Sequence, residues 1–236
     1  MTNNQENNNK QENKKYKDFL ENGCHYGRAK RFTHPSMKKY LLRSKNSNIE
    51  FFNLKKTVEK LNEVANSIKK IITENKIILF VGTKPSSEKA IKDIAQKFNM
   101  PYINYKWTGG LLTNFETIYK RLTYFKELLK KEETKELEEL PTYERQKIKK
   151  ELEKMKKIYY GLLNLNSLPD YIFIVDLNFK NHKTAYREAI KKNIPIIALA
   201  GSDNDISKIF SFIPANDKAP KSINFIISSL INLIKK

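Results

Sequence analysis

Three runs of the chain are apolar at nearly every position, a pattern typical of strands that are buried on both faces. They are IILFV (77–81), YIFIV (171–175) and IPIIALA (194–200), and MPYINY (100–105) adds a shorter run. A parallel sheet covered by helices on both sides requires such continuous hydrophobicity, whereas a half-exposed strand alternates. The pattern therefore predicts a mainly parallel sheet.

Amphipathic helical patterns lie between and after these runs. Apolar residues recur every three or four positions in residues 53–73, 86–98, 181–192 and 220–234, as they do on the buried stripe of a helix. Strands and helices that alternate along a chain predict a doubly wound α/β fold.

Residues 116–160 have a different pattern. The segment consists almost entirely of helix formers, with leucines at helical spacing, and Pro141 interrupts it midway. We expect two antiparallel helices joined by a turn near residues 134–142, inserted as a helical hairpin into an α/β domain made of residues 16–115 and 161–236. The segment holds 13 basic and 10 acidic residues, which favours a solvated hairpin with salt bridges over an arm that binds RNA directly.

A junction of unusual composition joins the sheet to this hairpin. It reads WTGGLLTNF (107–115) and contains the only tryptophan of the chain. Trp107 is either a core residue, which we favour, or a ring that stacks on RNA. Gly109 and Gly110 permit a positive φ or a close approach of the backbone. Thr113 or Asn114 can cap the helix that follows, so we expect this junction to serve through its shape.

Charge changes the picture more than any other bulk property. Lys and Arg number 45 against 26 Asp and Glu, a formal net charge of +19. Such an excess is self-repulsive unless a polyanion neutralises it, and nucleic acid is a commoner partner than an anionic membrane.

A single cysteine excludes an internal disulfide and fits a reducing compartment. The sequence has no apolar run long enough to cross a membrane, and the polar residues 1–15 predict a disordered tail rather than a targeting signal. We expect an intracellular protein.

Residues 26–45 concentrate basic and aromatic side chains without any acid. Lysine and arginine neutralise phosphates and aromatic rings stack on bases, so the combination is typical of an RNA-binding surface. A charged run is more often only a solvated face, but the total excess of charge and the absence of acids favour RNA here. The residues that we expect to contact RNA are Tyr26, Arg28, Lys30, Arg31, Lys38, Lys39, Arg43 and Lys45.

Gly82, Thr83 and Lys84 lie where the first predicted strand passes into a helix, a place where α/β enzymes bind the phosphates of a nucleotide. The chain has no G-x-G-x-x-G and no G-x-x-x-x-G-K-[ST] motif, and these are the motifs that such binding normally needs. A plain turn, or contact of Lys84 with an RNA phosphate, explains the stretch as well. An α/β enzyme that binds a nucleotide or a sugar phosphate is the rival hypothesis from another class.

Neither a metal centre nor a catalytic set is evident. Cys24, His25, His34 and His182 are the whole supply of soft ligands, and they form no C-x-x-C or H-x-x-x-H pair. Structural and catalytic zinc sites use such spacings. No G-x-S-x-G nucleophile elbow is present either. We therefore expect no metal and no cofactor.

Six motifs of the chain match those of a known family. They are GCHYGRAKRFTHPSMKKYL, ILFVGTK, KWTGGLLTNFETI, LPDYIFIVD, IPIIALA and IPANDKAPKSI, and they span about residues 16 to 235. Their order and spacing are those of the family, and W-x-GG-x-LTN is the most specific of them. On these residues the chain resembles the universal small-subunit ribosomal protein S-two family, in its bacterial or organellar form.

The resemblance implies a flavodoxin-like α/β domain with a protruding coiled-coil hairpin, placed on the solvent side of the small subunit between head and body. It implies binding to small-subunit rRNA, neighbouring ribosomal proteins as partners, proximity to the bacterial protein that delivers mRNA, and no enzymatic activity. The compartment would be the bacterial cytoplasm or an organelle matrix. A module that binds RNA outside the ribosome would share the basic segment but would have no reason to keep the other motifs.

Three positions depart from the family pattern. Arg28 stands where the family commonly has histidine, GSD (201–203) replaces a usual Asp-Thr-Asn, and Ala215 replaces a glycine. The first departure concerns an RNA contact and the other two concern loop geometry. We expect none of them to change the fold.

Overall fold

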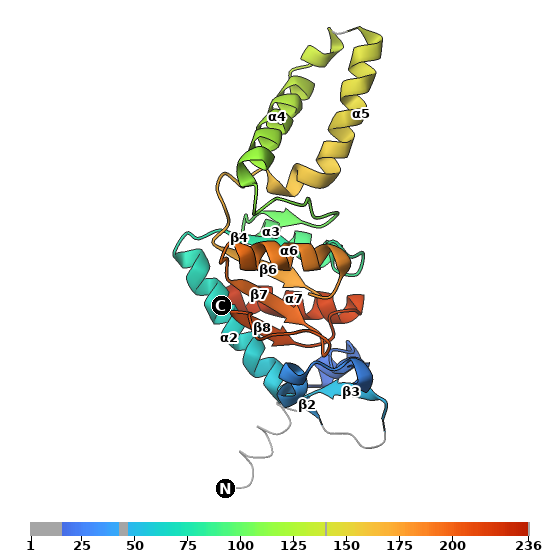
Figure 1. The fold of residues 1–236 in the computed structure, drawn as a ribbon, viewed down its shortest axis with the longest axis vertical. Coiled ribbons are helices and arrows are strands. Elements are labelled where there is room, and N and C mark those ends of the chain that lie inside the picture. Colours follow the sequence, from blue (N-terminus) through green and yellow to red (C-terminus); the bar gives the residue numbers. More distant parts are fainter. Residues whose placement is uncertain (1–15, 43–46, 140, 236) are drawn as a thin grey trace.

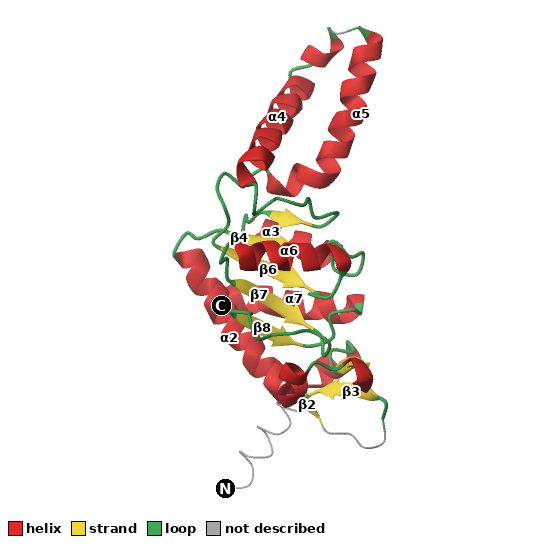
Figure 2. Cartoon of the chain, viewed as in Figure 1, coloured by secondary structure: helices red, strands yellow, loops and turns green. Residues whose placement is uncertain are grey.

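A small sheet, a larger sheet and a helical hairpin follow one another along the long axis of the molecule (Figure 1). This computed structural model describes residues 16–42, 47–139 and 141–235. The larger sheet and its helices form the middle, the hairpin projects from one end, and the three-stranded sheet lies at the other end (Figure 2). Most of the buried apolar residues belong to the middle part.

The larger sheet has five parallel strands in the order β5-β4-β6-β7-β8. Numbered along this sheet alone, the order is 2-1-3-4-5, the flavodoxin-like arrangement, so the prediction of a doubly wound fold is confirmed. The sequence pattern did not reveal the last strand, which ends in Pro214. That strand lies at an edge of the sheet, where a residue without an N–H is tolerated. The strands are β4 (Ile78–Val81), β5 (Tyr102–Ile103), β6 (Tyr171–Val175), β7 (Ile196–Ala200) and β8 (Ser211–Pro214).

Helices cover both faces of this sheet (Figure 1). Phe80 and Phe173 point to one face and belong to the same buried cluster as residues of α2, α3 and α7. Leu79 and Ile174 point to the opposite face and belong to the cluster that includes α6. Because successive strand residues alternate between faces, two buried faces need apolar residues at every position. The helices are α2 (Leu54–Thr73), α3 (Glu88–Lys97), α6 (Lys180–Lys191) and α7 (Pro220–Lys235).

The small sheet is antiparallel, with strand order β1-β3-β2, and the sequence pattern did not predict it. Its strands are β1 (Tyr26–Ala29), β2 (Leu41–Leu42) and β3 (Ile49–Phe52), and the 3-10 turns η1 (Lys30–Phe32) and η2 (Pro35–Tyr40) lie between β1 and β2. Two hydrogen bonds fasten it to the loop after β7: the Arg28 N–H donates to Ser202 Oγ at 2.7 Å and the His34 N–H donates to the Ser202 carbonyl at 2.9 Å. Such short strands give no periodic signal, so only their tertiary partners define them.

The hairpin consists of α4 (Phe115–Glu133), η3 (Glu136–Glu138), α5 (Thr142–Tyr159) and η4 (Tyr160–Leu162). The two helices and the turn appear where the sequence placed them. Leu122, Phe125 and Leu152 are fully buried, and Lys156 joins the two helices through an ion pair with Glu132 at 2.8 Å. Among the described helices, none combines the length and the hydrophobicity that a membrane crossing needs.

Candidate nucleic-acid interface

The basic residues of segment 26–45 that the structure describes lie on and around the small sheet. Arg31, Lys38 and Lys39 are exposed, and Arg28 and Lys30 are partly exposed. Together with Tyr26 and Phe32 we call these residues the basic face. Of the other residues expected to contact RNA, Arg43 and Lys45 lie outside the described residues, and Lys84 lies elsewhere on the molecule.

Two arginines of the basic face lie close to the same exposed ring. The guanidinium carbon of Arg31 lies 4.7 Å from the ring centroid of Phe32, and that of Arg28 lies 5.6 Å from it. The Phe32 side chain is 49% exposed, so burial does not explain its position. A planar cation held over an exposed ring offers both stacking and charge to an RNA chain.

A second group of rings borders the basic face. The ring centroids of His25 and Tyr26 are 4.0 Å apart, and Phe51 from β3 lies 6.0 Å from His25 in a stacked orientation. Burial lowers the pKa of His25, so this imidazole is neutral at pH 7. Tyr26 remains 48% exposed. The sequence analysis missed Phe51, because it belongs to a strand that only the tertiary structure places beside Tyr26.

Acidic residues from other segments approach the basic face. Glu50 accepts a hydrogen bond from the Thr33 hydroxyl at 3.1 Å, and Asp205 lies 3.9 Å from His34. Residues 26–45 contain no acid, but the folded surface around them therefore does. These carboxylates set the borders of any site for a polyanion, because phosphates avoid them.

Lys84 occupies the carboxyl edge of the parallel sheet, at the point where the strand order reverses. Doubly wound folds bind ligands at this place. Here Lys84 Nζ lies 3.5 Å from a carboxylate oxygen of Asp176, and the same carboxylate forms an ion pair with Lys218. The Asp176 side chain is almost completely buried. The edge that a nucleotide would use is thus occupied by the chain's own ion pairs, and Lys84 is less available to RNA than the sequence indicated.

His182 from α6 lies at the same edge of the sheet, where it joins the loop after β4 to the loop after β6. It is fully buried; its Nε2 accepts the N–H of Thr83 at 2.8 Å, and its Nδ1–H donates to the carbonyl of Asp176 at 2.9 Å. Burial lowers the pKa of His182, which agrees with a neutral ring that uses one nitrogen as acceptor and the other as donor. Its role is structural. Among the described residues no cluster of three potential ligands could hold a metal ion.

The loops after β7 and β8, which contain two of the departures from the family pattern, meet at Asp217. A Cβ atom added to Gly201 would lie 2.5 Å from Asp217 Oδ1, so this position requires glycine. Burial and the neighbouring charge of Asp176 raise the pKa of Asp217 to about 7. Lys218 lies 3.5 Å from Asp217 and 4.0 Å from Asp203. Ala215 is fully buried and donates its N–H to the Ala200 carbonyl at 3.2 Å, which an alanine does as well as a glycine.

The junction at residues 107–115 wraps around the carboxylate of Glu188. Oε1 accepts from Trp107 Nε1 at 3.1 Å and from the Gly110 N–H at 2.9 Å, and Oε2 accepts from the Leu112 N–H at 3.0 Å. The backbone and hydroxyl of Thr113 lie at 3.4 Å from Oε2. The sequence analysis missed Glu188. The helical spacing could have revealed it, because an acid that lies one turn after Ala185 and next to Ala189 falls on the apolar, buried face of α6.

The remaining junction residues differ in burial, in backbone conformation and in their role at the start of α4. The Trp107 ring is buried, with 4% of it exposed. Gly110 has a φ of 88°, but Gly109 has no positive φ and a Cβ there would meet nothing within 4 Å. The expectation of a special backbone is therefore wrong for Gly109. Asn114 occupies the N-cap position of α4 without a side-chain capping bond; its Oδ1 accepts from the Thr117 hydroxyl at 3.0 Å.

Comparisons with known proteins agree on one family. The sequence profile of the family described as ribosomal protein S2 matches residues 19–236 of this chain. The chain is also similar to the small ribosomal subunit protein uS2 of Coprothermobacter proteolyticus. The two are 38% identical over 218 residues, which cover 92% of this chain and 80% of the relative.

Proposed function

The chain belongs to the ribosomal protein S2 family, and on this premise we propose that its basic face binds small-subunit rRNA. It is a structural component of the small ribosomal subunit that supports translation, and it is not an enzyme. What the family does not define is which side chains of this sequence carry the RNA.

The observation that carries this proposal is that the guanidinium groups of Arg28 and Arg31 both lie over the exposed Phe32 ring. Neither arginine has an ion-pair partner among the described residues, so their charges are available to phosphates. Lys38 and Lys39 extend the charge along the last turn of η2. Accessible arginines beside an exposed ring match RNA better than a lipid surface, which has no bases to stack.

Salt dependence tests this assignment. We expect wild-type protein to bind bacterial small-subunit rRNA with an affinity that falls steeply with salt, because each phosphate contact releases counterions. Replacing Arg28, Arg31, Lys38 and Lys39 together with alanine should reduce the slope of log Kd against log salt by up to about 4. A matched variant that loses Lys69, Lys70, Lys89 and Lys92, all exposed on α2 and α3, removes the same charge and should keep the slope. Equal slopes in the two variants would place the RNA surface elsewhere.

We further propose that the ribosomal protein that delivers mRNA is among the neighbours of this chain. Membership in the ribosomal protein S2 family supports this proposal. Cross-linking of assembled small subunits with a lysine-reactive reagent, followed by mass spectrometry, should join the two proteins. Cross-links from this chain to other ribosomal proteins but not to that one would contradict it.

A further inference from the structure

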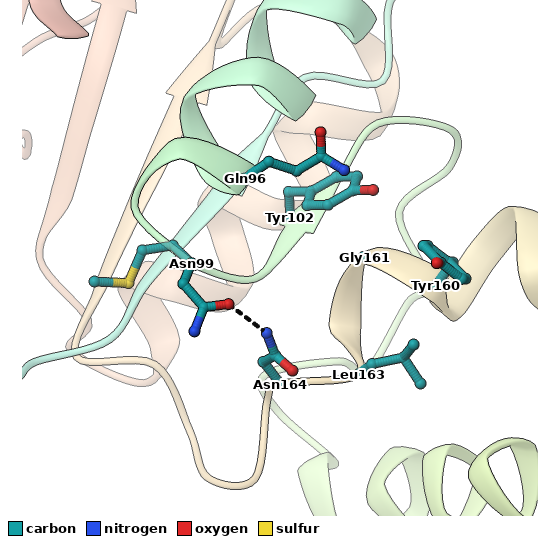
Figure 3. A pocket seen from close by; sticks show the side chains of 8 residues that line it. Gln96, Asn99, Tyr102, Tyr160, Gly161, Leu163 and Asn164 are labelled. Carbon is teal, nitrogen blue, oxygen red and sulfur yellow. Dashed lines mark hydrogen bonds between the residues drawn. The ribbon is translucent and has the colours of Figure 1, made fainter.

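A hollow of about 320 Å³ opens where the hairpin returns to the edge of the parallel sheet. It lies between the end of α3, the edge strand β5 and the turn η4, and Figure 3 shows it from close by. All eight residues that line it are uncharged, in a chain with a net charge of +19. Neither the basic face nor the ion pairs at the carboxyl edge contribute to it.

Two tyrosines from different elements border the hollow (Figure 3). Tyr102 belongs to β5 and is 8% exposed, whereas Tyr160 begins η4 and is 55% exposed. Burial, with a smaller effect of Tyr160, raises the pKa of Tyr102, so its phenol is neutral at pH 7. Between them, a Cβ on Gly161 would collide with the Tyr102 carbonyl. The backbone of Gly161 therefore packs directly against the backbone of β5, and the ring of Tyr160 remains accessible for stacking.

An amide pair supplies hydrogen-bonding groups of both kinds. Asn164 Nδ2 donates to Asn99 Oδ1 at 2.9 Å (Figure 3). This bond uses one donor and one acceptor, and it leaves the amide nitrogen of one asparagine and the amide oxygen of the other for a ligand. The same complement remains if both amides are reversed. A donor beside an acceptor matches the edge of a nucleobase.

We propose that this hollow, which we call the Tyr102–Tyr160 pocket, binds an unpaired base of small-subunit rRNA. The proposal rests on the proposed function, because it requires that the chain bind rRNA. The uncharged lining disfavours a phosphate or a lipid headgroup in the pocket itself. It suits a neutral, planar ligand with a hydrogen-bonding edge, and in single-stranded RNA such bases stack on aromatic side chains.

Positive charge lies beside the pocket rather than in it. Lys97 is exposed and follows the lining residue Gln96, and Lys157 is exposed one turn before Tyr160. Base and backbone of one nucleotide thus find separate partners.

Tyr160→Ala tests the pocket in the same binding experiment with small-subunit rRNA. Loss of one base–aromatic stack should weaken binding about 5- to 150-fold. The slope against salt should stay at the wild-type value, because an uncharged residue releases no counterion. Tyr160→Phe keeps the ring and should bind like wild type, as should Tyr124→Ala, which removes an exposed tyrosine of α4 away from the pocket. Melting temperature checks that all three variants fold.

The outcomes separate the two proposals. If the wild type shows no salt-dependent binding to the rRNA, both fail. If the wild type binds and the variant at Arg28, Arg31, Lys38 and Lys39 loses slope, but Tyr160→Ala binds as tightly as the wild type, only the pocket proposal fails.

Cross-linking identifies the occupant. In small subunits assembled with 4-thiouridine-substituted rRNA, irradiation should attach a nucleotide to the peptides that contain Tyr102 or Tyr160. A second ribosomal protein cross-linked to these peptides instead would assign the pocket to a protein contact and overturn the proposal. Saturable binding of free uridine or adenosine 5′-monophosphate that is lost in Tyr160→Ala, without any RNA cross-link, would also overturn it in favour of a soluble nucleotide.

Discussion

The indole N–H of Trp107 donates to a carboxylate oxygen of Glu188 at 3.1 Å, although 81 residues separate the two in sequence. The same carboxylate accepts backbone N–H groups of the loop that starts the hairpin. A buried carboxylate surrounded by donors in this way acts as a template for the loop, because the buried N–H groups of Trp107 and Leu112 would otherwise lack a partner.

Glu188→Ala should therefore be strongly destabilising. It removes the acceptor of two buried donors and of further partly buried ones, and we expect a loss of roughly 3–5 kcal/mol in the free energy of unfolding. Denaturant titration followed by Trp107 fluorescence measures it. Glu188→Gln keeps the shape but turns one oxygen into a donor, so it should fall between wild type and alanine. Glu59→Ala, at an exposed position of α2, should stay within about 0.5 kcal/mol. Equal stabilities of the Glu188 and Glu59 alanine variants would contradict the template role.

The two glycines of the junction should respond differently to the same substitution. Gly110→Val forces a β-branched residue to a φ of 88°, at a cost of roughly 1–3 kcal/mol. Gly109→Val meets open space and should change stability by about 0.5 kcal/mol or less. Thermal melting compares the two. If Gly109→Val were as destabilising as Gly110→Val, the backbone of the loop would not be the cause.

Replacing residues 116–160 with a flexible Gly-Ser linker should leave a folded α/β domain. Helices α4 and α5 contact each other through the rings of Phe125 and Tyr159, whose centroids are 6.3 Å apart, and the sheet keeps its covering helices. The exposure of Leu111 and Leu162 at the base should lower the melting temperature without abolishing cooperativity. Calorimetry would show a single transition. A broad, non-cooperative melt would mean that the hairpin is part of the main core.

Asp217 should make stability depend on pH. Its pKa is about 7 in the folded chain against an ordinary 3.8, so the native state holds a proton that the unfolded state has lost. Stability from this group therefore falls as pH rises from about 4 to about 7, by roughly 1.4 kcal/mol per unit of pKa difference. Asp176, Asp203 and Lys218 face this carboxyl group.

Asp217→Asn isolates the effect. The free energy of unfolding of Asp217→Asn minus that of the wild type should increase as the pH rises from about 4 to about 7. Urea titrations at pH 4, 5.5 and 7.5 measure this difference. A difference that is constant with pH would show that Asp217 is ionised throughout.

ATP, GTP and NAD should not bind at the carboxyl edge of the sheet. Lys84 and Lys218 already share the carboxylate of Asp176 there, and a nucleotide would have to break these ion pairs without a glycine-rich cradle to receive its phosphates. Calorimetry with each nucleotide should detect no binding. Micromolar affinity that is lost in Lys84→Ala would instead support the rival hypothesis of a nucleotide-binding enzyme.

The sequence by itself determined four of the five strands of the parallel sheet, its covering helices and the hairpin. Runs such as YIFIV are apolar at every position because their residues alternate between two covered faces, and helical periodicity records which side of each helix is buried. The motif match determined the family. These features are local or repeated, so one stretch of chain is enough to reveal them.

Only the tertiary structure decided the partners across long separations. It paired Glu188 with the loop around Trp107, set Phe51 beside Tyr26, brought Glu50 and Asp205 to the border of a segment that has no acid of its own, and joined Asn99 to Asn164 at the pocket. It also distinguished Gly110 from Gly109. A hydrogen bond between residues far apart in the chain leaves no period in the sequence, and a backbone angle depends on what surrounds it, so neither can be derived from one sequence alone.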